Sequence, residues 1–160
     1  MAIIICDTSS LSKLFITRTL DNLPELFKAV VIPRAVYEES IPALRVEIDK
    51  FNFLIESPRT SMFVQFGKGE REALNLALDK EFLGAFVLTD DRKAINAAAR
   101  VGIRTITAFD FFAALKLTNR ILSTQCLVKK LRSAGEGINE YELQRMLEKT
   151  GEKLGNFKSK

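Results

Sequence analysis

Residues 3–10 read Ile3-Ile4-Ile5-Cys6-Asp7-Thr8-Ser9-Ser10, an apolar run that ends on a carboxylate followed by three hydroxyls. Such a β-branched run is typical of a strand buried on both faces of a parallel sheet, and open α/β sheets bind ligands beyond the carboxyl ends of their strands. Asp7 is therefore expected at a functional position. Because Asp, Thr and Ser also favour helix caps, other acids must join Asp7 before a functional role is favoured over capping.

Further apolar runs alternate with segments of helical periodicity, at residues 29–32, 85–88 and 104–107. This alternation predicts parallel βαβ units, and hence a three-layer α/β/α domain with a central, mostly parallel sheet. From Phe109 onward the periodicity predicts a helical C-terminal segment, with a break at Gly135-Glu136-Gly137 and Asn139 as the cap of the next helix.

Between these runs, Pro33 is expected at the first position of a helix that Pro42 interrupts. The sequence further predicts a helix over residues 43–53, a loop or short edge element at residues 56–60, and helices over residues 70–82 and 92–100.

Length and composition are those of an ordinary globular protein, with 160 residues of which 47% are hydrophobic and 28% charged. They predict one domain over residues 1–154 and a frayed basic tail at residues 155–160. No stretch has the length and apolarity of a membrane span, and the N-terminus lacks the features of a secretory signal. We therefore expect a cytoplasmic protein that does not enter a membrane.

Two residue counts restrict the chemistry. The sequence contains no histidine, which excludes His-dependent triads, His-ligated zinc and imidazole acid–base catalysis. The two cysteines, Cys6 and Cys126, have neither the spacing of metal ligands nor that of a disulfide framework. Any catalysis by this chain must therefore depend on carboxylates. The net charge of +4 indicates a polyanionic partner only weakly.

Two glutamates share helical faces with apolar residues. Glu70 precedes apolar residues at offsets of three, four and seven, and Glu39 follows apolar residues at offsets of three and four. Both are expected to face inward, where an acid requires a partner. Glu38 falls on a neighbouring face, and a solvated acidic pair of Glu38 and Glu39 is the alternative.

Asp90 and Asp91 follow a predicted strand as Asp7 follows the first one, so acids are expected at the same edge of the sheet. Clustered carboxylates stay ionised mainly by binding cations, and oxygen ligands suit Mg²⁺ or Mn²⁺. Such ions assist the attack of water on phosphorus. The cluster therefore points to metal-assisted hydrolysis of phosphodiesters.

The order of four motifs resembles the PIN-domain family of metal-dependent nucleases, and especially a prokaryotic and archaeal branch related to VapC-like toxins. The resemblance covers nearly the whole chain. The motifs are DTS at residues 7–9, IPRAVYEE at 32–39, GKGEREAL at 67–74 and LTDDRKA at 88–94. One departure lies at residues 105–112, where glycines of this branch are missing and two extra aromatics follow Phe109. It leaves the acid positions intact and affects the expected shape of the substrate groove.

The resemblance implies a Mg²⁺- or Mn²⁺-dependent ribonuclease that leaves a 5′-phosphate and a 3′-hydroxyl. It implies that the catalytic metal ligands are Asp7, Glu39, Glu70 and Asp91, with Asp90 as a further ligand from the same motif. It further implies that Thr8 or Ser9 places a hydroxyl near the metal, and that three basic residues contact the phosphates of the substrate. These are Arg71, Arg92 and Lys93. For the three basic residues, solvated charges at helix starts are the alternative. A toxin role would add an antitoxin protein as partner, and a homodimer is expected.

Three other functions compete with the nuclease. A catalytically silent PIN-like module that binds RNA or a protein would keep the acids without hydrolysis. A phosphatase of the haloacid-dehalogenase type requires a second aspartate two residues after the first, but position 9 is Ser9. A receiver domain fits poorly because its acceptor aspartate should end a middle strand, without a second aspartate beside it.

Overall fold

A computed structural model describes residues 1–153 of the chain. Within it, contacts divide the chain into a unit of residues Met1–Thr107 and a second unit that begins at Ala108. The predicted tail at residues 155–160 lies outside the described residues, and a single domain over residues 1–154 stays a prediction.

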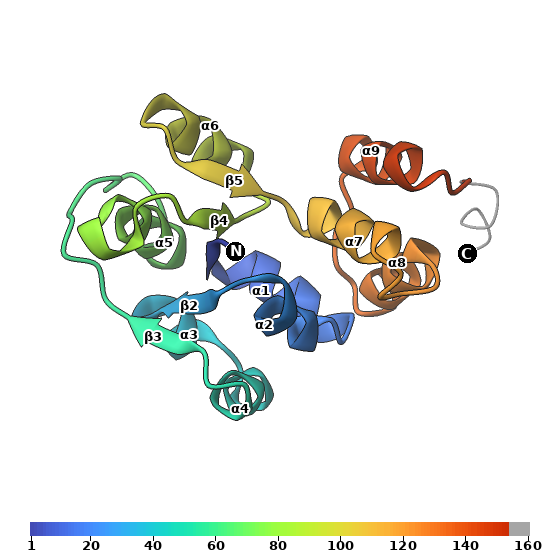
Figure 1. Cartoon of the computed structure of the whole chain (residues 1–160), viewed down its shortest axis with the longest axis horizontal. Coiled ribbons are helices and arrows are strands. Elements are labelled where there is room, and N and C mark those ends of the chain that lie inside the picture. The colour runs from blue at the N-terminus through green and yellow to red at the C-terminus, as the bar shows by residue number, and fades with distance from the viewer. Residues whose placement is uncertain (154–160) are drawn as a thin grey trace. The chain divides into compact units, whose positions relative to one another are not determined.

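The first unit is built on a five-stranded sheet in which all neighbouring strands are parallel (Figure 1). The sheet order is β3-β2-β1-β4-β5. Its strands are β1 (Ile3–Cys6), β2 (Ala29–Pro33), β3 (Leu54–Glu56), β4 (Phe86–Leu88) and β5 (Arg104–Ile106). The isoleucine run forms the central strand, where Ile4, Ile5 and Cys6 are completely buried. The predicted α/β/α class with a parallel sheet is confirmed.

Helices cover both faces of this sheet (Figure 1). Ile5, Val31 and Val87 contribute to a core formed with the buried alanines and leucines of α5 and α6, while α1, α2 and α4 lie on the other side. The helical elements of the unit are α1 (Thr8–Ile16), η1 (Leu20–Asn22), α2 (Leu23–Leu26), α3 (Arg34–Glu39), α4 (Pro42–Lys50), α5 (Lys68–Leu78), η2 (Lys80–Phe82) and α6 (Arg92–Arg100).

Three of the differences between the predicted and observed element boundaries have a clear structural reason. Pro33 belongs to β2, where it is in register with Glu56, so α3 begins one residue later than expected. The helix expected over residues 70–82 is interrupted at Asp79, whose extended backbone separates α5 from η2. The helix expected over residues 43–53 is α4, which ends at Lys50 just before Asn52 adopts a left-handed backbone with φ of 54°.

The second unit is helical, as predicted. It contains α7 (Ala108–Leu117), α8 (Thr124–Ser133) and α9 (Glu140–Thr150), and α7 packs against both α8 and α9. Asn139 caps α9 by accepting the Glu142 N–H at 3.0 Å, and Gly135 at φ 80° lies in the predicted break. The break between α7 and α8 was not predicted. None of the helices described for residues 1–153 combines the length and apolarity needed to cross a bilayer.

Candidate functional site

The strand order places a candidate site at the carboxyl ends of β1 and β4. From β1 the chain moves outward to β2 and β3, whereas β4 and β5 lie on the opposite side of β1. A crevice at such a reversal is where open α/β sheets bind ligands. Asp7 directly follows β1, and its N–H donates to the Leu88 carbonyl at 3.1 Å. Asp90 and Asp91 follow β4, so one edge of the sheet brings together these acids.

Asp7 combines full burial with an incomplete set of hydrogen bonds. Its side chain caps α1, because Oδ1 accepts the N–H of Ser10 at 2.9 Å. The other oxygen, Oδ2, is buried and has no hydrogen-bond partner, and the same is true of the Ser10 hydroxyl. Buried polar atoms are nearly always paired, so these two orphans identify a place where an additional group would be stabilised.

Burial raises the pKa of Asp7 to about 6. The nearby Thr89 and Ser10 hydroxyls and the Ser10 N–H favour the ionised form, although neither hydroxyl lies in hydrogen-bonding geometry with Oδ2. The charge of Asp90 raises the pKa further. An ionised carboxylate at this position is therefore unfavourable unless a cation accompanies it.

Glu39 is connected to the first acidic motif through Thr8. The Thr8 hydroxyl donates to Glu39 Oε2 at 2.7 Å. The first turn of α5 passes close by, because a Cβ at Gly69 would lie 2.6 Å from Thr8 Oγ1 and 3.1 Å from Glu39 Oε2. Glu39 itself is exposed, so its predicted inward orientation is wrong. Since α3 ends at Glu39, its last residue is not covered by the sheet.

Side chains from other elements hold α3 at both ends. At its start, the Ala35 N–H donates to Glu72 Oε1 at 2.9 Å. At its end, the Arg45 guanidinium donates to the Tyr37 carbonyl at 3.1 Å and to the Glu38 carbonyl at 2.8 Å. A helix of six residues is not stable by itself. These contacts therefore fix the short element that carries Glu39.

Glu70 and Asp91 complete the acidic side of the site. Glu70 lies half-buried in the first turn of α5, and burial, Asp91 and Glu39 all raise its pKa. Asp91 caps α6 by accepting the Lys93 N–H with Oδ1 at 3.1 Å. The charges of Asp91 and Glu39 therefore act on Glu70, and the charge of Asp90 acts on Asp7.

Asp90 has a cation of its own. Lys13 Nζ lies 2.5 Å from Asp90 Oδ2, and the two side chains are only 13% and 16% exposed. As the side chains stand in residues 1–153, no group of three or more acids or cysteines is drawn together closely enough to hold a metal ion.

The remaining predicted residues lie around this edge with different exposures. Ser9 is exposed, whereas Thr8 is partly buried and bonded to Glu39, so Thr8 is the hydroxyl that reaches the acids. Arg71 is partly buried, and Arg92 and Lys93 are exposed in the first turn of α6.

Four residues of this edge were missed by the sequence analysis: Ser10, Lys13, Gly69 and Thr89. Three of them left a signal in the sequence, since Ser10 is one of the hydroxyls after Asp7, Gly69 immediately precedes a motif glutamate, and Thr89 lies between a strand and an acid pair. Lys13 left none, because its partner is 77 residues away.

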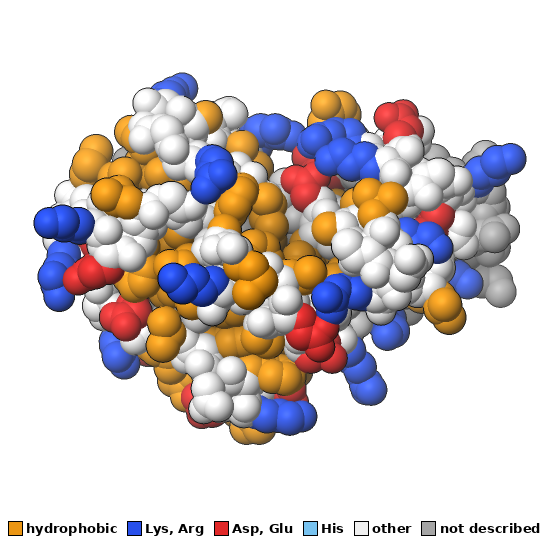
Figure 2. Space-filling view, in the orientation of Figure 1, with side chains coloured by type: hydrophobic (Ala, Val, Ile, Leu, Met, Phe, Trp, Pro, Cys, Tyr) orange, Lys and Arg blue, Asp and Glu red, His pale blue; other side chains and the backbone are white. Residues whose placement is uncertain are grey.

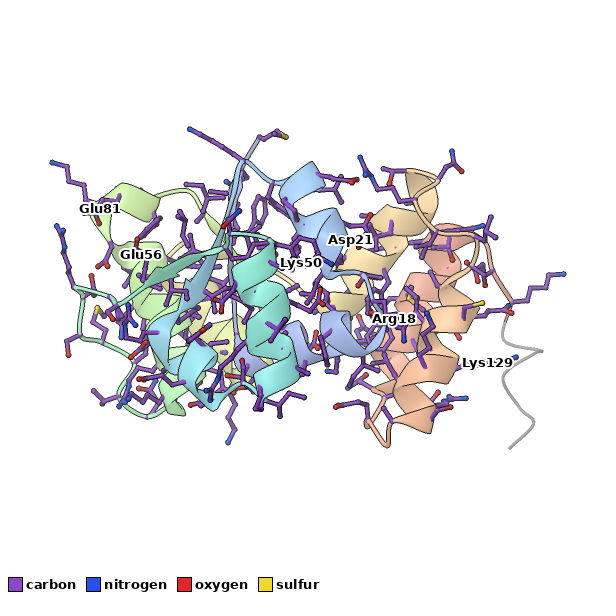
Figure 3. All side chains as sticks on the ribbon, turned by 90° about the horizontal axis from the view of Figure 1, so that it is seen from below. Arg18, Asp21, Lys50, Glu56, Glu81 and Lys129 are labelled. Carbon is purple, nitrogen blue, oxygen red and sulfur yellow. The ribbon has the colours of Figure 1, made fainter. Side chains whose placement is uncertain are left out.

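A hollow of about 570 Å³ lies in the first unit, and none of the residues predicted for the site lines it. Figure 3 labels three of its charged residues, Lys50 at the end of α4 and Arg18 and Asp21 after α1. On the face in Figure 2, basic and acidic side chains are scattered among hydrophobic ones. The hollow has cations and anions in equal number, with Glu47 as the second acid, so it has no charge preference for a ligand.

A comparison with protein families is consistent with this fold. The model of the PIN-domain family DUF3368 matches residues 3–152. Among solved structures, a PilT N-terminus domain protein from the hyperthermophilic archaeon Sulfolobus solfataricus P2 is similar, with 17% sequence identity, a TM-score of 0.45, and coverage of 82% of this chain and 94% of that chain. A search of curated proteins found no match. Because the family model matches nearly the whole length, the chain belongs to the PIN-domain family.

Proposed function

We propose that the protein is a Mg²⁺- or Mn²⁺-dependent ribonuclease that hydrolyses RNA phosphodiesters at the carboxyl edge of the sheet. PIN domains are generally metal-dependent nucleases, which supports the reaction class. The observation that carries the proposal is the buried Asp7 Oδ2, which has no hydrogen-bond partner and lies at the strand-order reversal. A divalent cation is the kind of group that stabilises such an oxygen.

The donor set fits a hard divalent cation. All candidate ligands are carboxylate oxygens, which suit Mg²⁺ and Mn²⁺ rather than zinc. The residues proposed to hold the metal are Asp7, Glu39, Glu70 and Asp91. A bound ion would polarise the scissile phosphate and make a water acidic enough to attack phosphorus.

The chain's own residues would position the acids and the RNA. The Thr8 hydroxyl orients Glu39, and Gly69 leaves room for that contact. We assign Arg71, Arg92 and Lys93 to the substrate phosphates, because basic groups beside the acids would offset the repulsion between RNA and carboxylates. The exposure of Arg92 and Lys93 supports this role, since side chains that meet a large polyanion must be accessible.

The finer expectations belong to the same proposal. They are a toxin role with an antitoxin protein as partner, a homodimer, and a cytoplasmic location. The toxin role and the homodimer depend on the resemblance to VapC-like proteins, and each of the three expectations needs its own experiment beyond RNA cleavage.

One observation favours the second candidate, a catalytically silent PIN-like module that binds RNA or protein. The acids of residues 1–153 are not drawn together as a metal would hold them. The two candidates make opposite predictions for Mn²⁺ binding, because a silent module does not require an ion.

The test is cleavage of end-labelled single-stranded and structured RNAs in Mn²⁺, Mg²⁺ or EDTA. The variants are Asp7→Asn and, as a control, Asp49→Asn, which removes an exposed carboxylate that accepts the Tyr37 hydroxyl. Circular dichroism verifies that each variant is folded. The ribonuclease proposal predicts metal-dependent cutting by the wild type and Asp49→Asn, and none by Asp7→Asn. Equal inactivity of all three, with no Mn²⁺ uptake by calorimetry, would instead support the binding module.

A further inference from the structure

We propose that a hollow at the amino ends of the strands anchors single-stranded RNA, with Arg104 stacking on a base and Lys28 contacting a phosphate. This inference rests on the proposed action on RNA and adds a contact remote from the acids. The hollow measures about 400 Å³ and lies where β1, β2, β4 and β5 begin, so we call it the amino-edge hollow. The four residues of β1 separate it from Asp7 by roughly 13 Å.

The charge of the amino-edge hollow has one sign. Lys28 and Arg104 are its two charged side chains, and no acid is among the residues that line it. Both residues are exposed, and no ion pair within residues 1–153 involves either of them. The hollow of about 570 Å³, in contrast, has equal numbers of cations and anions. Uncompensated cations attract anions, and RNA supplies phosphates.

Arg104 holds its guanidinium as a flat, oriented surface. The residue is in register with Phe86 on the neighbouring strand, and its Cζ atom lies 4.2 Å from the centre of the Phe86 ring. The Nη2 group also donates to the Gly84 carbonyl at 2.7 Å. These two contacts fix the plane of the guanidinium. Because Arg104 is nevertheless exposed, the accessible part of its guanidinium lies away from Phe86.

A guanidinium plane held in this way suits a nucleobase. Proteins that bind single-stranded RNA stack its bases on aromatic rings or on the planes of arginine side chains. Two apolar side chains that line the same hollow, Leu83 and Met1, are 67% and 86% exposed, and they offer further surface that a base can cover. An acidic peptide would use the two cations but would gain nothing from a stacking plane. The observations therefore favour a nucleotide.

Lys28 supplies the contact for a phosphate. Its N–H donates to the Ala2 carbonyl at 2.8 Å, which ties the residue before β2 to the residue before β1. A lysine ammonium acts as a compact point charge with freely rotating donors, and it binds a phosphate without the planar geometry that arginine provides. The two cations of the hollow are thus suited to different parts of one nucleotide.

The test is fluorescence anisotropy of a labelled single-stranded RNA of about 12 nucleotides, titrated with the full chain in EDTA. EDTA prevents metal-dependent cleavage, so the assay reports binding alone. Lys28→Met should weaken binding by about threefold to tenfold. It should also reduce the slope of log Kd against log salt by about 0.7, the value for one phosphate contact on a single strand.

Arg104→Lys separates stacking from charge. It keeps the positive charge and should leave the salt slope unchanged, but it should weaken RNA binding by about fivefold or more because an ammonium offers no plane to a base. Inorganic polyphosphate of equal charge has no bases, so it should bind the wild type and Arg104→Lys equally. Arg59→Lys and Arg59→Met are matched controls, since exposed Arg59 pairs with Glu81 and does not line the hollow. Both should bind RNA like the wild type.

A second measurement needs no variant. In NMR spectra of the ¹⁵N-labelled wild type, the amide signals of Leu83 and Gly84 should shift when the same RNA is added in EDTA. Signals that do not shift would overturn the inference even if the variants do not fold. Unchanged RNA affinity in folded Lys28→Met and Arg104→Lys would also overturn it, as would an oligoglutamate peptide that displaces the RNA at equal charge concentration.

Failure of this inference can be separated from failure of the proposed function. A wild type that cuts RNA with Mn²⁺, but whose RNA affinity does not depend on Lys28 and Arg104, would overturn only the amino-edge site. RNA that binds at the amino-edge hollow without being cut in Mn²⁺ or Mg²⁺ would support the site and overturn the ribonuclease proposal.

Discussion

Two buried aspartates in the first unit have opposite surroundings. Asp79, at the end of α5, uses both oxygens: Oδ2 accepts the Arg59 N–H at 2.8 Å, and Oδ1 accepts the Thr60 N–H at 2.9 Å and its hydroxyl at 2.6 Å. Asp7, at the end of β1, has one oxygen with no partner. The two residues are almost equally inaccessible, with 4% and 0% exposure.

The pKa values of Asp79 and Asp7 differ because their hydrogen-bond donors differ, not because their burial differs. Burial acts to raise the pKa of Asp79, but its hydrogen bonds with Thr60 and Arg59 outweigh this effect, and the pKa lies below the ordinary value. At Asp7 burial dominates and the pKa rises to about 6. A buried acid whose two oxygens both accept hydrogen bonds, such as Asp79, holds a loop in place. A buried acid with one unpartnered oxygen, such as Asp7, can bind a ligand.

The largest expected difference between the two aspartates is in RNA cleavage. Asp7→Asn should lower the rate by more than about 100-fold, because loss of a metal ligand should exceed the effect of losing a residue that only supports one. Asp79→Asn should leave the rate per folded molecule within about twofold, because Asp79 is not a ligand. Single-turnover cleavage of an end-labelled RNA with Mn²⁺ measures both. Equal losses of cleavage rate in Asp7→Asn and Asp79→Asn would contradict the proposed difference between the two aspartates.

The next effect is on stability. Asp79→Ala should lower the free energy of unfolding by about 2–3 kcal/mol, because it leaves two backbone N–H groups and the Thr60 hydroxyl without their acceptor. Urea unfolding followed by circular dichroism measures it. Glu81→Ala is a suitable control, since it removes a nearby exposed acid that pairs with exposed Arg59, and it should have little effect.

Close packing around Thr8 and Glu39 can be tested by a substitution at Gly69. Gly69→Ala should destabilise the protein by about 1–3 kcal/mol and weaken Mn²⁺ binding, because the new Cβ requires Thr8 or Glu39 to move. Gly137→Ala is the matched control, since a Cβ there meets no atom within 4 Å. Thermal unfolding and calorimetry with Mn²⁺ provide the two measurements. An unaffected Gly69→Ala variant would mean that the contact with Thr8 is unimportant.

The smallest expected effect is a pH dependence from Asp79. Because its pKa in the folded protein lies below the ordinary value of 3.8, the unfolded chain takes up a proton first as the pH falls. The stability that Asp79 contributes is complete above that ordinary value and is lost as the pH falls through the folded-state value. The stability difference between the wild type and Asp79→Asn should therefore shrink between about pH 5 and pH 2. Urea unfolding across this range measures it, and a constant difference would contradict the assignment.

The fold was largely predictable because its signals are local. The apolar runs that form β1, β2 and β4 have the hydrophobicity that a buried strand requires. The errors arose where tertiary contacts decide. Pro33 joins β2 because Glu56 pairs with it, and α5 ends at Asp79, whose carboxylate is engaged by a distant loop.

The acids of the candidate site were also predictable, since strand ends of a parallel sheet share an edge. Their partners were not. The Thr8–Glu39 bond spans 31 residues and the Lys13–Asp90 pair spans 77, and no local pattern encodes either contact. The exposure of Glu39 was missed because helical spacing says nothing about where a short helix ends.

The most direct test of the distinction between the two aspartates is the stability of Asp7→Asn with and without Mn²⁺. Asparagine can still cap α1, and its amide can donate to the unpartnered Ser10 hydroxyl. In EDTA at neutral pH the variant should therefore be more stable than the wild type by about 1–2 kcal/mol, because a buried ionised carboxylate is replaced by a neutral group. Mn²⁺ should stabilise the wild type and not the variant. If Asp7→Asn instead loses stability in EDTA, and Mn²⁺ shifts both proteins equally, Asp7 is a structural residue like Asp79.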